Sequence, residues 1–281
     1  MNASSSGERL NRLSFRRALA VIAPLLAAAS PSWADAPFAP WDGPDPIAVW
    51  HVFSVWSSHG PSLVVYEDGE VLYRKGGDLH SEYLHRRLDA DALRAVKDRL
   101  AATDLSDVKS WYDLAPGVTD MPTTFLYVKA AGRVRKIRLY GMSAKGTLLA
   151  STRYPTDVKP EAVPDQVGEL REYLRSLTLP DGVPWTPRYI EVSLQPYEYA
   201  PDASIHWPKK WPGLRSSRTT KDEYGYSIYL DWQQHEELSA FLRSRKEKGA
   251  IVIDGRKWSA SLNWVIPREP DWARGALADP D

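Results

Sequence analysis

Short turns between alternating apolar runs constrain this chain most strongly. Asp68-Gly69 lies inside "SLVVYEDGEVLYRK", and Asp254-Gly255 lies inside "AIVIDGRKWSASLNWVIP". An aspartate–glycine pair tolerates the positive φ angles that a tight hairpin turn needs. A third apolar pair of runs, "TTFLYVKAAGRVRKIRLY", turns at residues 130–133. The chain is therefore expected to form antiparallel sheets.

Helices are expected between these hairpins, because apolar residues there recur at helical spacing. Asp89 is expected to cap a helix, and Pro164 suits the start of a second helix over 165–177. Asp231 and Gln234 match a capping box for a third helix, which Gly249 closes. The expected buried stripes are Leu93, Val96 and Leu100; Val167, Leu170, Leu174 and Leu177; and Leu238, Phe241 and Leu242. Further strands are expected over 47–56, 82–88, 188–195 and 224–230, and the stretch 196–222 reads as a long irregular loop.

The order of these elements predicts an α+β protein of two small domains, each a mostly antiparallel sheet with one or two helices packed on one face. The expected ranges are a signal peptide 1–36, an irregular lead-in 37–46, a first domain 47–178, a linker 179–187, a second domain 188–269 and a tail 270–281. Both halves contain a strand, an aspartate-capped helix and a hairpin. That order fits either an old duplication or an arrangement common among α+β domains.

The N-terminal segment has the pattern of an export signal. Its basic start holds Arg9, Arg12, Arg16 and Arg17, and an apolar stretch over 18–29 is too short to span a bilayer as a helix. Small residues predict cleavage after Ala34 or Ala36, and the alternative is an uncleaved membrane anchor. Arg16-Arg17 also occurs in twin-arginine signals, but the surrounding pattern favours the general secretory route. We expect an exported protein, periplasmic or extracellular, that is not an integral membrane protein after cleavage.

Composition excludes several classes of function. The chain has no cysteine, which excludes disulfides, zinc-thiolate sites and thiol catalysis. Without residues 1–36 it has 32 basic and 34 acidic residues, a net charge of −2. That balance gives no support for binding nucleic acid.

Three stretches of the first half carry a resemblance: "HGPSLVVYEDGEVLY", "TDMPTTFLYVKAAGRVRKIRLY" and the amphipathic helix that follows. Over about residues 52–177 the chain resembles a domain of unknown function found in exported bacterial proteins. Members of that family often carry cysteines before the Gly-Pro step, where this chain reads "WSSHGP". The resemblance implies a fold and an envelope location, and it implies no activity.

Few residues suggest chemistry, and each has a structural interpretation beside the functional one. Asp120, in "TDMP", is either an exposed carboxylate or a residue that fixes the turn into the hairpin. Ser57 and His59 lack the sharp turn and orienting carboxylate of a hydrolase. The remaining candidates are His80, His85, His206 and His235, which lack metal-ligand spacing, the acidic turn Glu67, Asp68 and Glu70, and Glu236-Glu237 in a helix first turn. We assign no catalytic residue, metal or cofactor.

Aromatic residues are the strongest recognition signal. The chain has 12 Trp and 14 Tyr, and they become denser after Pro184. Flat rings on a proline-stiffened loop lose little entropy when they bind. The candidate binding residues are His206, Trp207, Lys209, Lys210, Trp211 and Arg215, in "HWPKKWPGLR". In the other interpretation the two tryptophans fold back over the sheet as part of its core.

Two classes of function stay open. The first is a non-catalytic binding or interaction protein of the cell envelope, whose partner is an envelope protein or a glycan. The alternative is a hydrolase-like enzyme whose carboxylates, such as Asp113, Asp120, Glu198 or Asp202, converge only in the fold.

Overall fold

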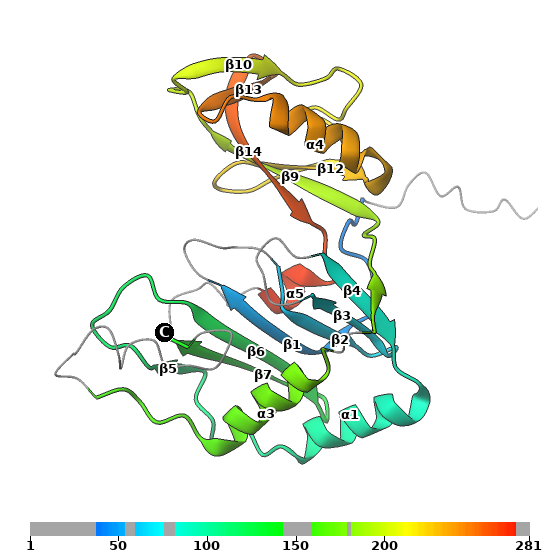
Figure 1. Ribbon diagram of the computed structural model, residues 1–281, viewed down its shortest axis with the longest axis vertical. Coiled ribbons are helices and arrows are strands. Elements are labelled where there is room, and N and C mark those ends of the chain that lie inside the picture. Colours follow the sequence, from blue (N-terminus) through cyan, green and yellow to red (C-terminus); the bar gives the residue numbers. More distant parts are fainter. Residues whose placement is uncertain (1–37, 54–59, 76–81, 143–158, 179–180, 274–281) are drawn as a thin grey trace, which may run out of the picture. The chain divides into compact units, whose positions relative to one another are not determined.

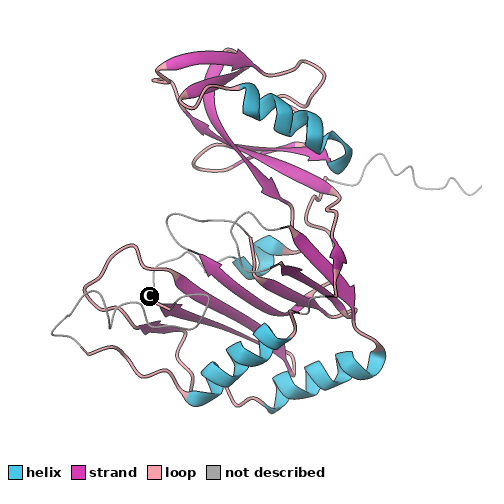
Figure 2. Cartoon of the chain, in the orientation of Figure 1, coloured by secondary structure: helices cyan, strands magenta, loops and turns pink. Residues whose placement is uncertain are grey.

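The computed structural model describes residues 38–53, 60–75, 82–142, 159–178 and 181–273. Within these ranges the chain is mixed α+β, with strands in two mostly antiparallel sheets (Figure 2). The predicted fold class is confirmed. Both sheets lie in one compact unit, residues 38–281, so separate folding of the two halves stays a prediction.

The first sheet is built from the predicted hairpins and from two short edge strands. Its strands are β1 Pro46–Phe53, β2 Leu63–Tyr66, β3 Glu70–Arg74, β4 Tyr83–Arg87, β5 Trp111–Asp113, β6 Thr123–Ala130, β7 Arg133–Tyr140 and β8 Val183–Pro184. Their spatial order is β5-β7-β6-β1-β2-β3-β4-β8, and β5 alone is parallel to its neighbour. Gly69 has a φ of 91°, which explains the glycine in the β2–β3 turn.

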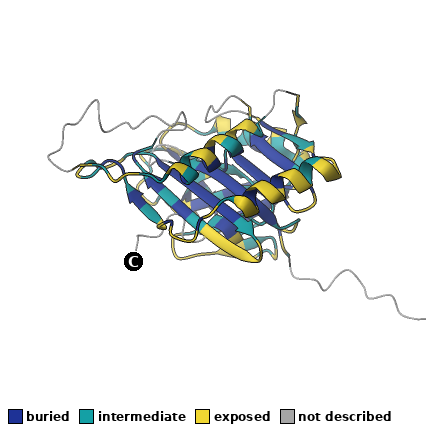
Figure 3. Ribbon diagram, turned by 90° about the horizontal axis from the view of Figure 1, so that it is seen from below, coloured by how far each residue is buried: buried dark blue, intermediate teal, exposed yellow. Residues whose placement is uncertain are grey.

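Two predicted helices cover one face of this sheet (Figure 1), α1 Ala90–Ala102 and α3 Asp165–Ser176. The Asp89 carboxylate accepts a hydrogen bond of 2.8 Å from the Ala92 amide, as expected of a cap. The predicted apolar stripes of both helices pack into one core with alternate residues of the strands. Figure 3 shows these helices lying across buried strands, with their outer sides exposed.

The opposite face of the first sheet is covered by the end of the described chain. Residues 270–281 were expected to be a tail, but α5, Glu269–Ala273, is helical and its Trp272 is buried. Trp272 and Ile266 pack against Val49, Val64 and Phe125. We call residues 264–273 the C-terminal strap. Burial of its apolar side chains on the sheet explains why so short a helix is held.

The second sheet contains more strands than expected. Its strands are β9 Tyr189–Pro196, β10 Asp202–His206, β11 Thr219–Lys221, β12 Tyr226–Asp231, β13 Gly249–Ile253 and β14 Arg256–Trp264, in the spatial order β10-β13-β14-β9-β12-β11. A 3₁₀ turn, Trp232–Gln234, leads into α4, His235–Ser244. The stripe Leu238, Phe241 and Leu242 packs against one face of the sheet, as predicted.

Three local expectations for the second half are wrong. The stretch 196–222 is not wholly irregular, since β10 and β11 lie within it. The Asp231 side chain caps no helix amide, because its carboxylate pairs with Arg218 at 2.8 Å. Gly249 begins β13 and does not close α4, whose cap is Arg245.

The proline-rich segment expected to link the domains is partly strand. Val183 and Pro184 of β8 pair with β4, and the Trp185 amide donates a 2.8 Å hydrogen bond to the Tyr83 carbonyl. Residues 179–180 lie outside the described residues. The segment therefore extends the edge of the first sheet before the chain enters the second.

Candidate functional site

The two tryptophans of "HWPKKWPGLR" are buried. Trp207 is 8% exposed and Trp211 is 4% exposed, and both belong to the core under α4. Their rings meet edge to face, with centroids 4.9 Å apart, and both contact Phe241. Trp207 Nε1 also donates a 3.0 Å hydrogen bond to the Pro212 carbonyl. Stacking on a ligand needs an exposed ring face, so these rings anchor the loop to the core.

The charged residues of the same segment lie on the surface. His206, Lys209, Lys210 and Arg215 are exposed, and Lys210 forms an ion pair with Glu237 of α4. The predicted site is therefore divided between a buried aromatic layer and an exposed, mostly basic layer. A binding role for the exposed layer stays a prediction.

Three of the four carboxylates named for a hydrolase have a hydrogen-bond or ion-pair partner, and the fourth lies exposed at a turn. Asp113 accepts a hydrogen bond from the Ala115 amide, and Asp202 accepts one from the Lys248 amide. Glu198 pairs with Arg256 at 3.6 Å. Asp120 has a φ of 62° and lies exposed at the turn before β6, which fits its structural interpretation. No contact in the described part of the chain joins any two of the four.

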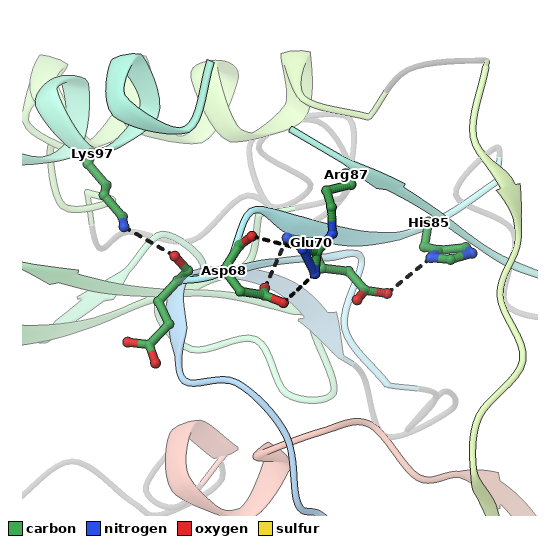
Figure 4. Close-up of polar contacts among 6 residues, drawn as sticks. Asp68, Glu70, His85, Arg87 and Lys97 are labelled. Carbon is green, nitrogen blue, oxygen red and sulfur yellow. Dashed lines mark hydrogen bonds and ion pairs between the residues drawn. The ribbon is translucent and has the colours of Figure 1, made fainter. Parts of the chain in front are cut away.

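Neighbouring side chains bind two carboxylates and one backbone carbonyl of the acidic turn between β2 and β3 (Figure 4). Asp68 pairs with Arg87 at 2.6 Å and accepts a hydrogen bond from the Glu70 amide. Glu70 in turn contacts His85 Nδ1 at 3.0 Å. Lys97 of α1 donates to the Glu67 carbonyl. Within the described ranges no group of three or more acidic or histidine side chains is arranged to hold a metal ion.

The other histidine and serine candidates give no site. Ser57, His59 and His80 lie outside the described residues. His235 stacks on Trp232, with ring centroids 4.3 Å apart. A depression of about 320 Å³ lies between the end of α1 and the β6–β7 turn, and none of the candidate site residues lines it.

Two tyrosines of the second half are exposed, whereas most aromatic rings of that half are buried or partly buried. Tyr199 is 96% exposed and Tyr224 is 72% exposed. Both were visible in the sequence as part of the aromatic-rich half, but nothing in their spacing distinguished them from core residues. We call the two residues and the turns that carry them, 197–201 and 222–225, the tyrosine end.

Strand pairing places both turns at one end of the second sheet. Tyr199 follows Pro196, the last residue of β9, and Tyr224 precedes Tyr226, which pairs with Leu194 of β9. A Cβ atom on Gly225 would lie 1.8 Å from the Leu194 carbonyl oxygen, so only glycine allows this close approach. The two tyrosines therefore stand on neighbouring turns.

Both turns are held by local hydrogen bonds. Asp222 Oδ1 accepts hydrogen bonds from the amides of Tyr224 and Gly225, at 2.8 and 2.7 Å. The Tyr197 amide donates to the Lys257 carbonyl at 3.0 Å. Prolines flank the first turn, at 196 and 201. Rings carried on such constrained turns lose little conformational freedom on binding.

A second group of residues missed in the sequence comprises ionisable side chains around the C-terminal strap. Burial, together with the negative charge of Glu191 on β9, raises the pKa of Glu269 to about 8. Burial also raises the pKa of Glu191, which accepts a hydrogen bond from Ser227. Only the fold places the Glu191 charge where it affects the pKa of Glu269, since the two residues are far apart in the sequence.

The first sheet contributes a cation and a buried histidine to the same region. Burial, together with the nearby Arg74 charge, lowers the pKa of His51 to about 4. Arg74 Nε donates to the Tyr83 hydroxyl at 3.2 Å, and that hydroxyl donates to the Pro61 carbonyl at 3.0 Å. His51 Nδ1 is buried without a hydrogen-bond partner. Arg74 is thus a cation shared by several buried groups.

Comparison with known proteins found no match to any family model, curated protein or solved structure. The resemblance of residues 52–177 to an uncharacterised exported domain therefore stays a prediction from sequence. Among the described helices, none is both long and apolar enough to cross a membrane.

Proposed function

We propose that this chain is an exported, non-catalytic binding protein of the cell envelope, and that its tyrosine end recognises a glycan. The observation that carries the proposal is the exposure of Tyr199 and Tyr224 on neighbouring, constrained turns. The basic start and short apolar stretch of residues 1–36 support export.

The surroundings of the two rings favour a glycan over a protein partner. The core of a protein–protein interface is depleted of charged residues. Exposed charged groups instead lie next to the rings, Glu198 beside Tyr199 and Glu223 beside Tyr224. The Glu198–Arg256 ion pair supplies hydrogen-bonding groups near Tyr199. Sugars present flat C–H faces that suit aromatic rings and hydroxyl groups that suit such side chains.

The hydrolase alternative has less support. Three of its four named carboxylates have a hydrogen-bond or ion-pair partner, Asp120 lies exposed at a turn, and no contact joins the four in the described residues. Glu191 and Glu269 have raised pKa values, for which burial is the largest cause. Both residues are partly exposed, but no hydrogen bond or ion pair in the described residues joins them into an acid–base pair.

Co-sedimentation with insoluble polysaccharides tests the proposal. The mature chain, residues 37–281, is mixed with peptidoglycan, cellulose or chitin, beside a Tyr199→Ala/Tyr224→Ala variant. We expect the parent protein to sediment with at least one polysaccharide. The variant should bind that polysaccharide at least about tenfold more weakly, because stacked aromatic anchors dominate such contacts. Lys209→Ala/Arg215→Ala is the matched control, since it removes exposed side chains from the same half and leaves both tyrosines.

Two results would overturn the proposal. In one, the parent protein sediments with none of the three polysaccharides. In the other, the tyrosine variant sediments as well as the parent while the Lys209→Ala/Arg215→Ala variant does not, which would move recognition to the basic layer of 206–215.

A further inference from the structure

We infer that the glycan bound at the tyrosine end is a neutral oligosaccharide, and that it continues from the two tyrosines onto the outer face of the second sheet, opposite α4. The inference rests on the function proposed above and names the class of its ligand. Six uncharged polar side chains form the surface, which we call the hydroxyl face: Gln195, Ser193, Ser227, Thr220, Ser259 and Ser261.

Strand register places these side chains in two neighbouring rows. Four hydroxyl side chains from four adjacent strands make one row: Thr220, Ser227, Ser193 and Ser261. Gln195 and Ser259 pair in the next row, two residues nearer the tyrosine end. Val192 and Leu194 alternate with these rows on β9 and belong to the core under α4. Because successive strand residues point to opposite faces, both rows lie on the outer face.

The hydroxyl face is continuous with the tyrosine end. Gln195 is the last residue but one of β9, and Tyr199 follows four residues later. A Cβ atom on Gly225 would lie 3.5 Å from the Gln195 Cα, so the turn that carries Tyr224 is directly beside this row. The row of four strands is about 14 Å wide, since neighbouring strands lie about 4.8 Å apart. That width exceeds one sugar ring, so the surface accommodates an oligosaccharide.

At its other end the hydroxyl face is closed by the first described residues of the chain. The row beyond Ser193 contains Glu191 and, opposite it, Tyr229. The ring centroids of Phe38 and Trp41 lie 5.5 and 5.3 Å from that of Tyr229, which is fully buried. The surface is therefore bounded on this side and leads toward the two exposed tyrosines on the other.

The hydroxyl face has unused hydrogen-bonding capacity. Gln195 and Ser261 are exposed, and Ser193 is half-buried. None of these three side chains hydrogen-bonds another described residue, whereas the Ser227 and Ser259 hydroxyls have local partners. Strands favour β-branched and aromatic residues, so strand formation does not explain four serines at these positions. Hydroxyl and amide groups both donate and accept, as sugar hydroxyls require.

The charge on the outer face favours a neutral glycan. Strand alternation adds one carboxyl group to the six uncharged side chains, Glu191, and one cation, Lys257, two residues before Ser259. No second lysine or arginine of the described strands shares this face. Recognition of an anionic ligand depends on clusters of such cations. The balance of one positive and one negative group therefore gives an anionic glycan no advantage.

Titration with soluble hexasaccharides tests the inference. Isothermal calorimetry of the mature chain at pH 7 compares two neutral probes, cellohexaose and chitohexaose, with the anionic hexagalacturonate. We expect a neutral hexamer to bind the parent and to bind Ser193→Ala/Ser261→Ala at least about fivefold more weakly, because two hydrogen bonds are lost. Ser217→Ala/Ser244→Ala is the matched control. It removes two exposed hydroxyl groups of the same half that lie outside the sheet, and it should bind as the parent does.

The absence of cysteine gives a second, positional readout. Ser261→Cys and Ser244→Cys each introduce a single exposed thiol, the first on the hydroxyl face and the second at the end of α4. Labelling by a methanethiosulfonate reagent is measured with and without a saturating neutral hexamer. We expect the hexamer to slow labelling of Ser261→Cys several-fold and to leave Ser244→Cys unchanged.

Failure of the inference is distinguishable from failure of the proposed function. The inference alone is overturned if Tyr199→Ala/Tyr224→Ala weakens binding while Ser193→Ala/Ser261→Ala does not and Ser261→Cys is not protected, since the glycan is then confined to the tyrosine end. Tighter binding of hexagalacturonate than of both neutral hexamers would also overturn it. Binding of none of the three hexamers would overturn it as well, and co-sedimentation then decides separately whether the glycan function stands.

Discussion

The segment 206–215 and the tyrosine end resemble each other in composition and differ in environment. Both are loops of the second half with aromatic rings, proline and charge. Trp207 and Trp211 pack against Phe241 of α4, whereas Tyr199 and Tyr224 are exposed and contact no other aromatic ring among the described residues. The comparison teaches that loop composition alone does not identify a recognition surface. Whether a loop ring is buried or exposed depends on whether the core beside the loop has room for it.

The largest effect should come from removing a buried ring. Trp211→Ala should lower the free energy of unfolding by about 3–5 kcal/mol, because it leaves a cavity beside Trp207 and Phe241. Urea unfolding at pH 7 measures the change. Lys209→Ala, two residues earlier and exposed, should stay within about 0.5 kcal/mol of the parent. Equal effects of the two variants would mean that the ring is not core.

Acidification should destabilise the folded chain through the buried His51 of the first sheet. The pKa of His51 is about 4 in the folded chain and near 6.5 when unfolded, so its contribution is fully present above pH 6.5. That contribution is lost as pH falls from about 6.5 to about 4, by about 3 kcal/mol at most, and is constant below. Urea unfolding at pH 7.5 and 4.5 should therefore show a larger loss in the parent than in His51→Phe. The same loss in both would show that His51 is not buried.

Replacing the aspartate before a helix should have a smaller effect on stability, and that effect should differ between Asp89 and Asp231. Asp89→Ala should cost about 1 kcal/mol, because Asp89 holds the Ala92 amide at the start of α1. Asp231→Ala should cost less, since its side chain caps no amide and forms only a partly exposed ion pair with Arg218. Thermal or urea unfolding compares the stability of the two variants. A larger loss of stability for Asp231→Ala would mean that Asp231 caps a helix, as the sequence suggested.

The smallest stability effect should belong to the tyrosine end. Tyr199→Ala/Tyr224→Ala should change the free energy of unfolding by less than about 0.5 kcal/mol, since neither ring is buried. The same urea titration measures it. A loss comparable with that of Trp211→Ala would show that these rings also serve the core and would remove the basis of the comparison.

Local features of the fold were predictable from sequence because local residues determine them. Aspartate–glycine turns fixed two hairpins, and Asp89 with its apolar stripe fixed α1. Non-local features were not predictable. β10 is strand because it pairs in parallel with β13, more than 40 residues later in the chain. α5 is ordered because Trp272 packs against Val49 and Phe125 of the first sheet.

The candidate site was only partly predictable for the same reason. The sequence drew attention to the aromatic-rich half, but the exposure of each ring depends on neighbours that the sequence does not place. Tyr199 and Tyr224 have the same spacing signal as core tyrosines such as Tyr229. The charge of Glu191 on β9 acts on Glu269 of α5, about 80 residues later in the chain, and no motif indicated this.

Hydroxyl-radical footprinting, with and without the polysaccharide that sediments the protein, tests the central claim most directly. It reads ring exposure residue by residue, so it compares both loops in one sample. We predict that Tyr199 and Tyr224 are oxidised rapidly in the free protein and are protected by the polysaccharide, while Trp207 and Trp211 react slowly in both states. Rapid oxidation of Trp207 and Trp211, with protection on binding, would contradict the account and return recognition to "HWPKKWPGLR".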